Sequence, residues 1–104
     1  MNHRRHYTYS VEILEEDVQW TQVEICEVCD ISAEELTDYV SEGLIDPVGR
    51  NPDEWRFQGA TLQRIRFAKH VQQDLGVNAA GAALALDLLQ EISRLKRKLD
   101  RPGT

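Results

Sequence analysis

The sequence has few cysteines, histidines and aromatic residues, and it has no long apolar run. Two of its 104 residues are cysteines, three are histidines, and aromatic residues make up 7%. No apolar run approaches the roughly 20 residues that a membrane-spanning helix requires. The first residues carry charge without an apolar segment behind them, so we expect no secretory signal. These absences predict a single soluble domain with a modest core, located in the cytoplasm.

The two cysteines, Cys26 and Cys29, have the C-x-x-C spacing of a redox pair or of half a zinc site. A zinc site needs four ligands, and the sequence offers neither a second pair nor a histidine at a matching spacing. We therefore interpret them as two thiols on one helical turn, at least one of which lies in the core. The sequence predicts no metal and no cofactor.

A catalytic constellation is also missing. His70 has no serine, cysteine or acid arranged around it, and no glycine-rich phosphate loop is present. Carboxylates are plentiful, but acid–base catalysis needs a pocket that shifts their pKa values, and we expect them on a convex surface. We predict that the protein is not an enzyme.

Basic residues are scarce in the first 60 residues. The whole chain has 18 acidic and 12 basic residues, a net charge of −6. Residues 1–60 hold fourteen Asp or Glu and four Lys or Arg. Residues 61–104 hold four Asp or Glu and eight Lys or Arg. The chain therefore has an acidic front, with a net charge of −10, and a basic back, with a net charge of +4.

The chain begins with a predicted strand over residues 7–14, where apolar and polar side chains alternate. A helix is predicted over residues 22–29, because Thr21 and a glutamate three residues later make a capping box. Its inward-facing candidates are Val23, Cys26 and Ile25.

A second short helix is predicted over residues 33–42. Ser32 and Glu35 form its capping box, and Gly43 ends it. Its apolar stripe consists of Leu36, Tyr39 and Val40. Two short helices joined by a tight turn make a helix-turn-helix.

A hairpin is predicted next. Residues 44–47 are extended, residues 49–53 are rich in turn formers, and residues 55–57 resume an alternating pattern. Such a hairpin beside a helix-turn-helix is a wing.

Two longer helices are predicted at the end of the chain. One covers residues 60–75 and ends at Gly76, and Asn78 caps another that runs from residue 79 to about 101. The first half of the last helix is small and apolar nearly all round, so we expect it to be buried. Its second half carries a heptad seam, which predicts a homodimer; the alternative is packing on the chain's own domain. The seam consists of Ala85, Leu88, Ile92, Leu95 and Leu99.

The order of these elements resembles the MerR-type winged helix-turn-helix superfamily. The motifs that carry the resemblance are Glu42-Gly43-Leu44-Ile45-Asp46-Pro47, Trp55-Arg56-Phe57, Leu62 through Ile65, and Leu75-Gly76-Val77. It implies a mainly helical fold with a small β wing and a long C-terminal helix. We divide the chain into an N-terminal strand or tail (1–19), the winged helix-turn-helix (20–77) and a dimerisation or packing helix (78–104).

Within that superfamily the chain resembles the CbpM family of chaperone modulators. The matching features are a cysteine in the first helix, Cys26, the run Ile31-Ser32-Ala33-Glu34-Glu35-Leu36, and the final helix from Ala83 to Leu95. The resemblance implies a dimer that binds the J-domain of a DnaJ-type co-chaperone, CbpA, and blocks its stimulation of DnaK. It also implies that DNA is not the target.

The charge of the second helix agrees with that implication. A DNA-reading helix enters the major groove and depends on Lys and Arg contacts to phosphate. This helix has four carboxylates and no cation, so it suits the basic helix that J-domains present. The predicted partner-binding residues are Glu34, Glu35, Asp38 and Glu42, with Glu27 and Trp55 as weaker candidates.

Simpler interpretations stand beside this one. A charged helix face is often only solvated. Trp55 fits core packing better than a contact role, although Trp55, Tyr39 and Trp20 are the candidate apolar anchors. Two other functions stay open: a MerR-type DNA-binding regulator that uses Arg50, Arg56 and the basic last helix, and a dimerising adaptor for another basic protein.

Overall fold

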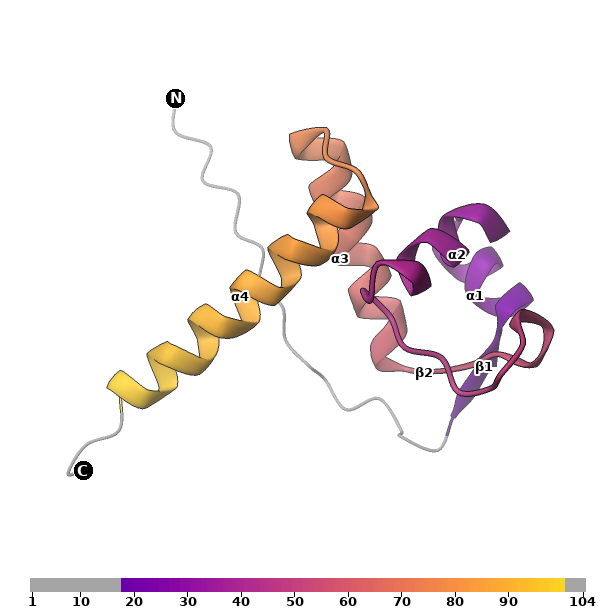
Figure 1. Cartoon of the computed structure of the whole chain (residues 1–104), viewed down its shortest axis with the longest axis horizontal. Coiled ribbons are helices and arrows are strands. Elements are labelled where there is room, and N and C mark those ends of the chain that lie inside the picture. The colour runs from indigo at the N-terminus through magenta and orange to yellow at the C-terminus, as the bar shows by residue number, and fades with distance from the viewer. Residues whose placement is uncertain (1–17, 101–104) are drawn as a thin grey trace.

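The computed structural model describes residues 18–100, which form a helical body with one long helix projecting from it (Figure 1). The predicted strand over residues 7–14 lies outside the described residues. The mainly helical architecture with a small antiparallel sheet confirms the predicted fold class. Its elements are β1 (Gln19–Thr21), α1 (Gln22–Cys29), α2 (Ala33–Ser41), a 3-10 turn (Pro52–Glu54), β2 (Arg56–Gln58), α3 (Ala60–Leu75) and α4 (Ala79–Leu99).

Both predicted capping boxes are present. The Thr21 hydroxyl accepts a hydrogen bond of 3.2 Å from the Glu24 N–H, and the Glu24 carboxylate accepts one of 2.9 Å from the Thr21 N–H. At α2 the Ser32 hydroxyl accepts a hydrogen bond of 3.0 Å from the Glu35 N–H, and the Glu35 carboxylate accepts one of 3.2 Å from the Ser32 N–H. Asp30 ends α1 in a left-handed conformation, with φ of 53°. These local bonds fix the tight turn of the helix-turn-helix.

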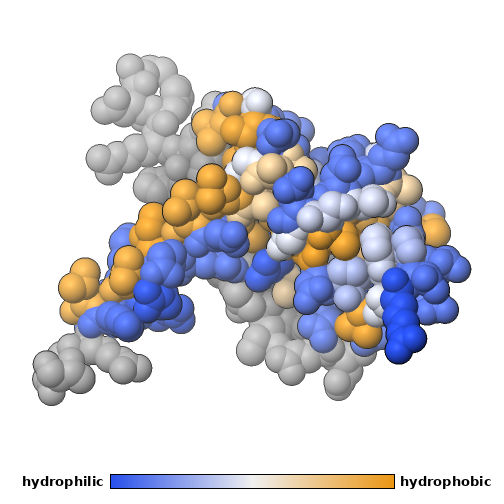
Figure 2. Space-filling model, in the orientation of Figure 1, coloured by the Kyte–Doolittle hydropathy of each residue, from blue (hydrophilic) through white to orange (hydrophobic). Residues whose placement is uncertain are grey.

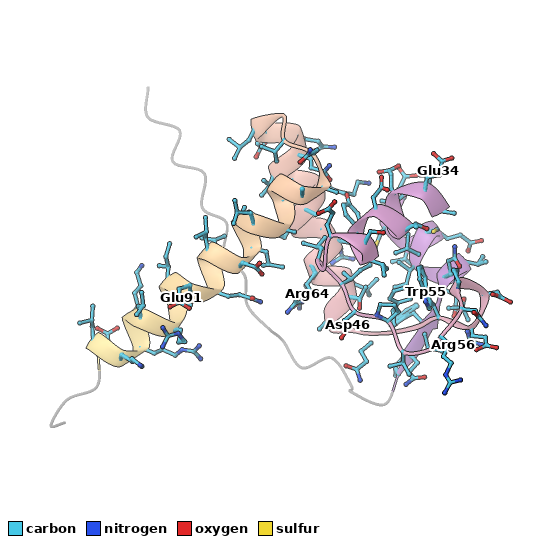
Figure 3. The ribbon with its side chains drawn as sticks, in the orientation of Figure 1. Glu34, Asp46, Trp55, Arg56, Arg64 and Glu91 are labelled. Carbon is cyan, nitrogen blue, oxygen red and sulfur yellow. The ribbon has the colours of Figure 1, made fainter. Side chains whose placement is uncertain are left out.

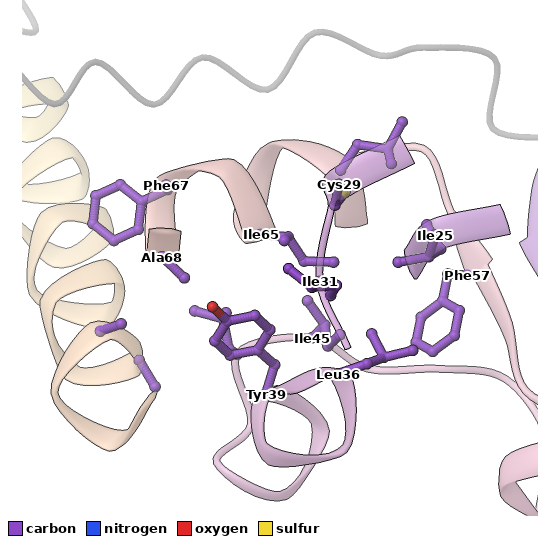
Figure 4. Close-up of a cluster of buried hydrophobic side chains, with 14 of the residues drawn as sticks. Ile25, Cys29, Ile31, Leu36, Tyr39, Ile45, Phe57, Ile65, Phe67 and Ala68 are labelled. Atoms are coloured by element: carbon purple, nitrogen blue, oxygen red, sulfur yellow. The ribbon is translucent and has the colours of Figure 1, made fainter. Parts of the chain in front are cut away.

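The core lies where α1, α2, α3 and β2 meet (Figure 4). Ile25 of α1, Leu36 of α2 and Phe57 of β2 are fully buried there. The prediction that Val23 faces inward is wrong, because Val23 is 65% exposed. Ile25 is two residues further on, which places it about 200° further round the helix. Since this short helix has apolar residues on both sides, its own sequence does not decide which side is buried.

The predicted hairpin is only partly correct. Arg56 pairs with Val48, as a wing requires, but this is a single bridge. The main partner of β2 is β1. The two strands are antiparallel, and Trp20 of β1 lies opposite Phe57 of β2. The chain before Arg56 cannot form a longer ladder, because it contains two prolines without N–H groups and a 3-10 turn. The sheet therefore ties the segment before α1 to the segment before α3.

The last two helices have the predicted starts, and α4 ends at Leu99, close to the predicted end. Gly76 ends α3 with φ of 67°, and the Asn78 side chain accepts a hydrogen bond of 2.9 Å from the Gly81 N–H. The expected burial of the first half of α4 is only partly correct. Ala82, Ala83 and Leu86 are buried, but Leu84 is exposed because α4 packs on the body along one side only.

Among the described residues, no single helix is long and apolar enough to cross a membrane. Only α3 and α4 taken together reach that length and composition, and they are bent by 113° at their junction.

Candidate protein-binding surface

Three carboxylates lie on the outer side of α2. Glu34, Asp38 and Glu42 follow one another at four-residue intervals and are all exposed, so they share one side of the helix. Figure 3 shows Glu34 pointing away from the body of the molecule. Leu36 and Tyr39 occupy the buried side. We call the outer side, together with the neighbouring Glu35, the acidic face.

No cation of residues 18–100 pairs with the acidic face. The ion pair found in this part of the chain joins Glu91 and Arg94, far along α4. Two cations of α3 have other partners. Lys69 donates hydrogen bonds to the backbone oxygens of Cys29 and Asp30, at 2.8 and 3.0 Å. The Arg64 guanidinium likewise donates to the Leu44 carbonyl, at 3.0 Å. The negative potential of the acidic face is therefore not neutralised within the described fold.

Glu35 differs from its neighbours on the acidic face. Its carboxylate accepts the Ser32 N–H and thereby caps α2. Its charge still lies at the surface, because the residue is exposed. Glu35 thus has a structural role as well as its predicted binding role, and a substitution there changes both stability and charge.

A shallow hollow lies on the outer surface of α2. Its walls are Ala33, Glu34, Thr37 and Asp38. The hollow is open to solvent rather than enclosed, which suits one side chain of a protein partner better than a small substrate.

The weaker predicted binding residues divide into one exposed and one buried. Glu27 is exposed on α1. Trp55 is only 9% exposed and packs edge-to-face against Phe57, with ring centroids 6.1 Å apart. The burial of Trp55 and its contact with Phe57 fit the core-packing interpretation better than a contact role. The Tyr39 ring is also buried, which removes it as an anchor.

The thiols of α1 are protonated at neutral pH. Burial raises the pKa of Cys29, and burial followed by the charge of Glu35 raises that of Cys26. Cys29 is buried and Cys26 is half-buried, which confirms that at least one thiol lies in the core. A nucleophilic or redox-active cysteine has a lowered pKa instead. Residues 18–100 also contain no cluster of side chains able to hold a metal ion.

The predicted seam of α4 forms an exposed apolar stripe, which is visible along the projecting helix in Figure 2. Four of its five residues are between 46% and 85% exposed: Leu88, Ile92, Leu95 and Leu99. Ala85 is the exception, since it packs partly against the core, and Leu84 joins the exposed stripe instead. The exposure of Leu84 was not predictable from its sequence surroundings, because the first half of α4 is small and apolar nearly all round.

Comparisons with known proteins agree with this architecture. The model of the MerR HTH family of regulatory proteins matches residues 20–101. The chaperone modulatory protein CbpM of Pseudomonas putida (strain W619) is 37% identical over 79 residues, which are 76% of this chain and 78% of that protein. CbpM of Coxiella burnetii (strain Dugway 5J108-111) is 34% identical over 76 residues, 73% and 72% of the two chains. The chain belongs to the CbpM family.

This CbpM family member departs from a DNA reader at its second helix. In a helix-turn-helix that reads DNA, that helix enters the major groove. Here α2 has no basic residue in any of its turns and carries Glu34, Glu35 and Asp38. The exposed arginines of the wing, Arg50 and Arg56, belong to a separate loop and strand. The MerR-type scaffold is thus combined with a surface that repels phosphate.

Proposed function

We propose that this CbpM family member is a chaperone modulator that binds the J-domain of a CbpA-type co-chaperone and inhibits its stimulation of DnaK. The observation that carries the proposal is the acidic face of α2, whose carboxylates have no cation partner in the described fold. The names of the relatives, chaperone modulatory proteins, support the chaperone role. The protein acts by binding, without catalysis and without a cofactor.

The inhibition follows from competition for one surface. A J-domain engages DnaK through a basic helix, and the acidic face has the complementary potential. When α2 lies against that helix, DnaK loses access to it. Charge complementarity of this kind mainly accelerates encounter and selects the partner, and apolar contacts add affinity.

A charge-reversal titration tests the proposal. The J-domain of the same organism's CbpA-type protein is titrated with wild type and with Glu34→Lys plus Asp38→Lys. Neither substitution touches a capping bond, and both side chains are exposed. We expect the double variant to bind at least tenfold more weakly, on the order of 1.4 kcal/mol.

A matched control changes the net charge by the same amount elsewhere. Asp46→Lys plus Asp53→Lys reverses two exposed carboxylates, and Figure 3 shows Asp46 at the opposite end of the body from Glu34. The control retains wild-type affinity and wild-type inhibition of J-domain-stimulated ATP hydrolysis by DnaK. If both double variants lose the same affinity, net charge rather than the acidic face is responsible. If wild type does not bind the J-domain, the proposed function is wrong.

The exposed stripe of α4 supports a homodimer as the working form. Leu88, Ile92, Leu95 and Leu99 follow a heptad spacing, are between 46% and 85% exposed, and do not belong to the core of the described residues. A second copy of the same helix offers the matching stripe. The acidic face lies on α2, whereas α4, which carries the stripe, projects beyond the body (Figure 1), so a dimer formed through that end of α4 leaves α2 free for the co-chaperone.

The match to the MerR regulatory family favours DNA binding as a second candidate function. In that case Arg50 and Arg56 of the wing and the basic end of α4 would contact phosphates. A gel shift with genomic fragments at low salt tests it. Retention of a specific fragment favours this candidate. Binding to basic proteins other than the J-domain would instead indicate a general adaptor.

A further inference from the structure

An exposed apolar strip lies on α1. Val23 is 65% exposed, and Cys26, three residues further on, is half-buried on the same side of the helix. Glu27 follows Val23 by four residues and stands beside the strip. Val23 contributes little to the core, because Ile25 and Cys29 are the buried residues of α1. We call Val23 and Cys26 the α1 strip.

The α1 strip continues into the acidic face of α2. Helices α1 and α2 pack against each other across the tight turn, and the Cys26 thiol is close enough to Glu35 to feel its charge. The negative charge of Glu35 reaches the Cys26 thiol and, after burial, contributes to its raised pKa. Glu35 is also one helical turn from Asp38. Carboxylates of both helices therefore lie near the strip, Glu27 on α1 and Glu35 on α2, with Asp38 one helical turn beyond Glu35.

This arrangement has the chemistry of a protein-binding hot spot. A well-packed apolar anchor inside a polar rim supplies most of the affinity of many interfaces. The Cys26 thiol stays neutral at physiological pH, so the strip has no charge of its own. A cationic amphipathic helix fits it, since such a helix presents an aliphatic or aromatic side chain flanked by Lys or Arg one turn away.

We propose that the α1 strip is the apolar anchor of the partner-binding surface, where Val23 and Cys26 receive an apolar side chain of a cationic amphipathic helix. The basic residues of that helix pair with Glu27 on α1 and Asp38 on α2. This inference rests on the proposed function, because the J-domain supplies the helix. It extends the binding surface from α2 to α1 and assigns much of the affinity to a residue that does not stabilise the fold.

Paired truncations on one helix test the inference. Val23→Ala and Val28→Ala remove the same methyl groups from two exposed valines of α1, and Val28 is about 140° further round the helix than Val23. Both substitutions favour helix, so both variants fold. Against the J-domain, we expect Val23→Ala to raise the Kd about tenfold and Val28→Ala to change it by less than about twofold.

Alkylation of the cysteines gives an independent readout. In the free protein N-ethylmaleimide modifies the half-buried Cys26 before the buried Cys29, as mass spectrometry of peptides detects. Saturating J-domain slows modification of Cys26 several-fold, because the bound helix covers the thiol. Equal alkylation rates with and without the J-domain contradict the inference.

The outcomes separate the inference from the proposed function. Loss of binding in Glu34→Lys plus Asp38→Lys, with equal affinities for Val23→Ala and Val28→Ala, supports the acidic face and overturns the anchor. Loss in Val23→Ala alone supports the apolar anchor on α1 and overturns both the acidic face and the pairing with Asp38. A wild-type protein that does not bind the J-domain overturns both.

Discussion

The Tyr39 hydroxyl donates a hydrogen bond of 2.6 Å to Oε1 of Gln72, and this bond joins α2 to α3. The Tyr39 ring is 2% exposed, so the side chain holds the helix of the acidic face on the core by packing and by one polar contact. The pKa of Tyr39 is raised, first by burial and then by nearby negative charges, so its hydroxyl remains a donor at neutral pH.

The two contributions of Tyr39 are separable. Tyr39→Phe removes the hydroxyl alone, and Gln72 can turn to water because it is only partly buried, so we expect a loss of about 1 kcal/mol of unfolding free energy. Tyr39→Ala leaves a cavity and costs roughly 3–5 kcal/mol. Urea denaturation followed by circular dichroism measures both. Equal losses in the two variants would show that the ring contributes no packing energy of its own.

The capping box of α2 predicts that substitutions at Ser32 and at Glu35 have different effects: one lowers the stability of the fold and the other lowers the affinity for the J-domain. Ser32→Ala removes the acceptor of the Glu35 N–H and lowers the unfolding free energy by about 1 kcal/mol, without changing the affinity of the folded protein for the J-domain. Glu35→Gln keeps an acceptor for the Ser32 N–H but removes the charge. It therefore keeps its stability and binds more weakly. Urea denaturation and titration with the J-domain measure both effects in both variants. Weaker binding by Ser32→Ala together with lower stability of Glu35→Gln would contradict the prediction.

The features that were predictable from the sequence are the local ones. They include both capping boxes, the end of α3 at Gly76 and the start of α4 at Asn78. Each of these depends on residues within one turn of each other. The exposure of the three carboxylates of α2 and of Glu42 at its end was predictable for the same reason, since a polar helix with one apolar stripe has only one outer side.

The features that were not predictable depend on distant parts of the chain. The side of α1 that is buried is set by packing against α3 and β2, so that of the predicted inward-facing residues Ile25 is buried whereas Val23 is exposed. The partner of β2 is a strand 35 or more residues earlier, which no local pattern indicates. Trp55 has the side chain of an interface anchor and the burial of a core residue. The anchor proposed here, Val23, was assigned to the core for lack of this tertiary information.

The capping box of α1 predicts a dependence of stability on pH. Hydrogen bonds from the Thr21 backbone and side chain, followed by the charge of Arg56, lower the pKa of Glu24 below its ordinary value of 4.5. A group whose pKa is lower in the folded state contributes stability that is fully present above 4.5 and is lost as the pH falls through the folded value. The protein is therefore expected to lose stability in acid partly through Glu24.

Glu24→Gln tests this expectation. Glutamine retains the capping geometry but does not titrate, so the unfolding free energy of the variant falls less steeply with acid than that of wild type. Urea midpoints at pH values of about 7, 5, 4 and 3 measure the slope. Glu91→Gln is the companion variant, because the pKa of Glu91 is also lowered, by its bond to Arg94. Parallel curves for wild type and Glu24→Gln would mean that Glu24 titrates alike in the folded and unfolded chains.

The exposed stripe of α4 predicts that one charge within it converts a dimer to a monomer. Leu88 and Ile92 lie at neighbouring seam positions, so an aspartate at either one would bury an unpaired charge in the interface. Wild type is expected to sediment as a dimer at micromolar concentration, and Leu88→Asp and Ile92→Asp as monomers. Their far-UV circular dichroism stays close to that of wild type, because neither side chain belongs to the core of the single chain.

Ser93→Asp is the matched control for the dimer. Ser93 is exposed on α4 one residue beyond Ile92, about 100° round the helix from the seam. It introduces the same charge without entering the stripe, so sedimentation velocity should report a dimer. A monomeric wild type would contradict the prediction that the stripe is a dimer interface. A monomeric Ser93→Asp would show that a charge anywhere on α4 prevents association. Because the acidic face lies on α2 and the part of α4 that projects beyond the body carries much of the stripe, monomeric Leu88→Asp should still bind the J-domain, with one co-chaperone per chain.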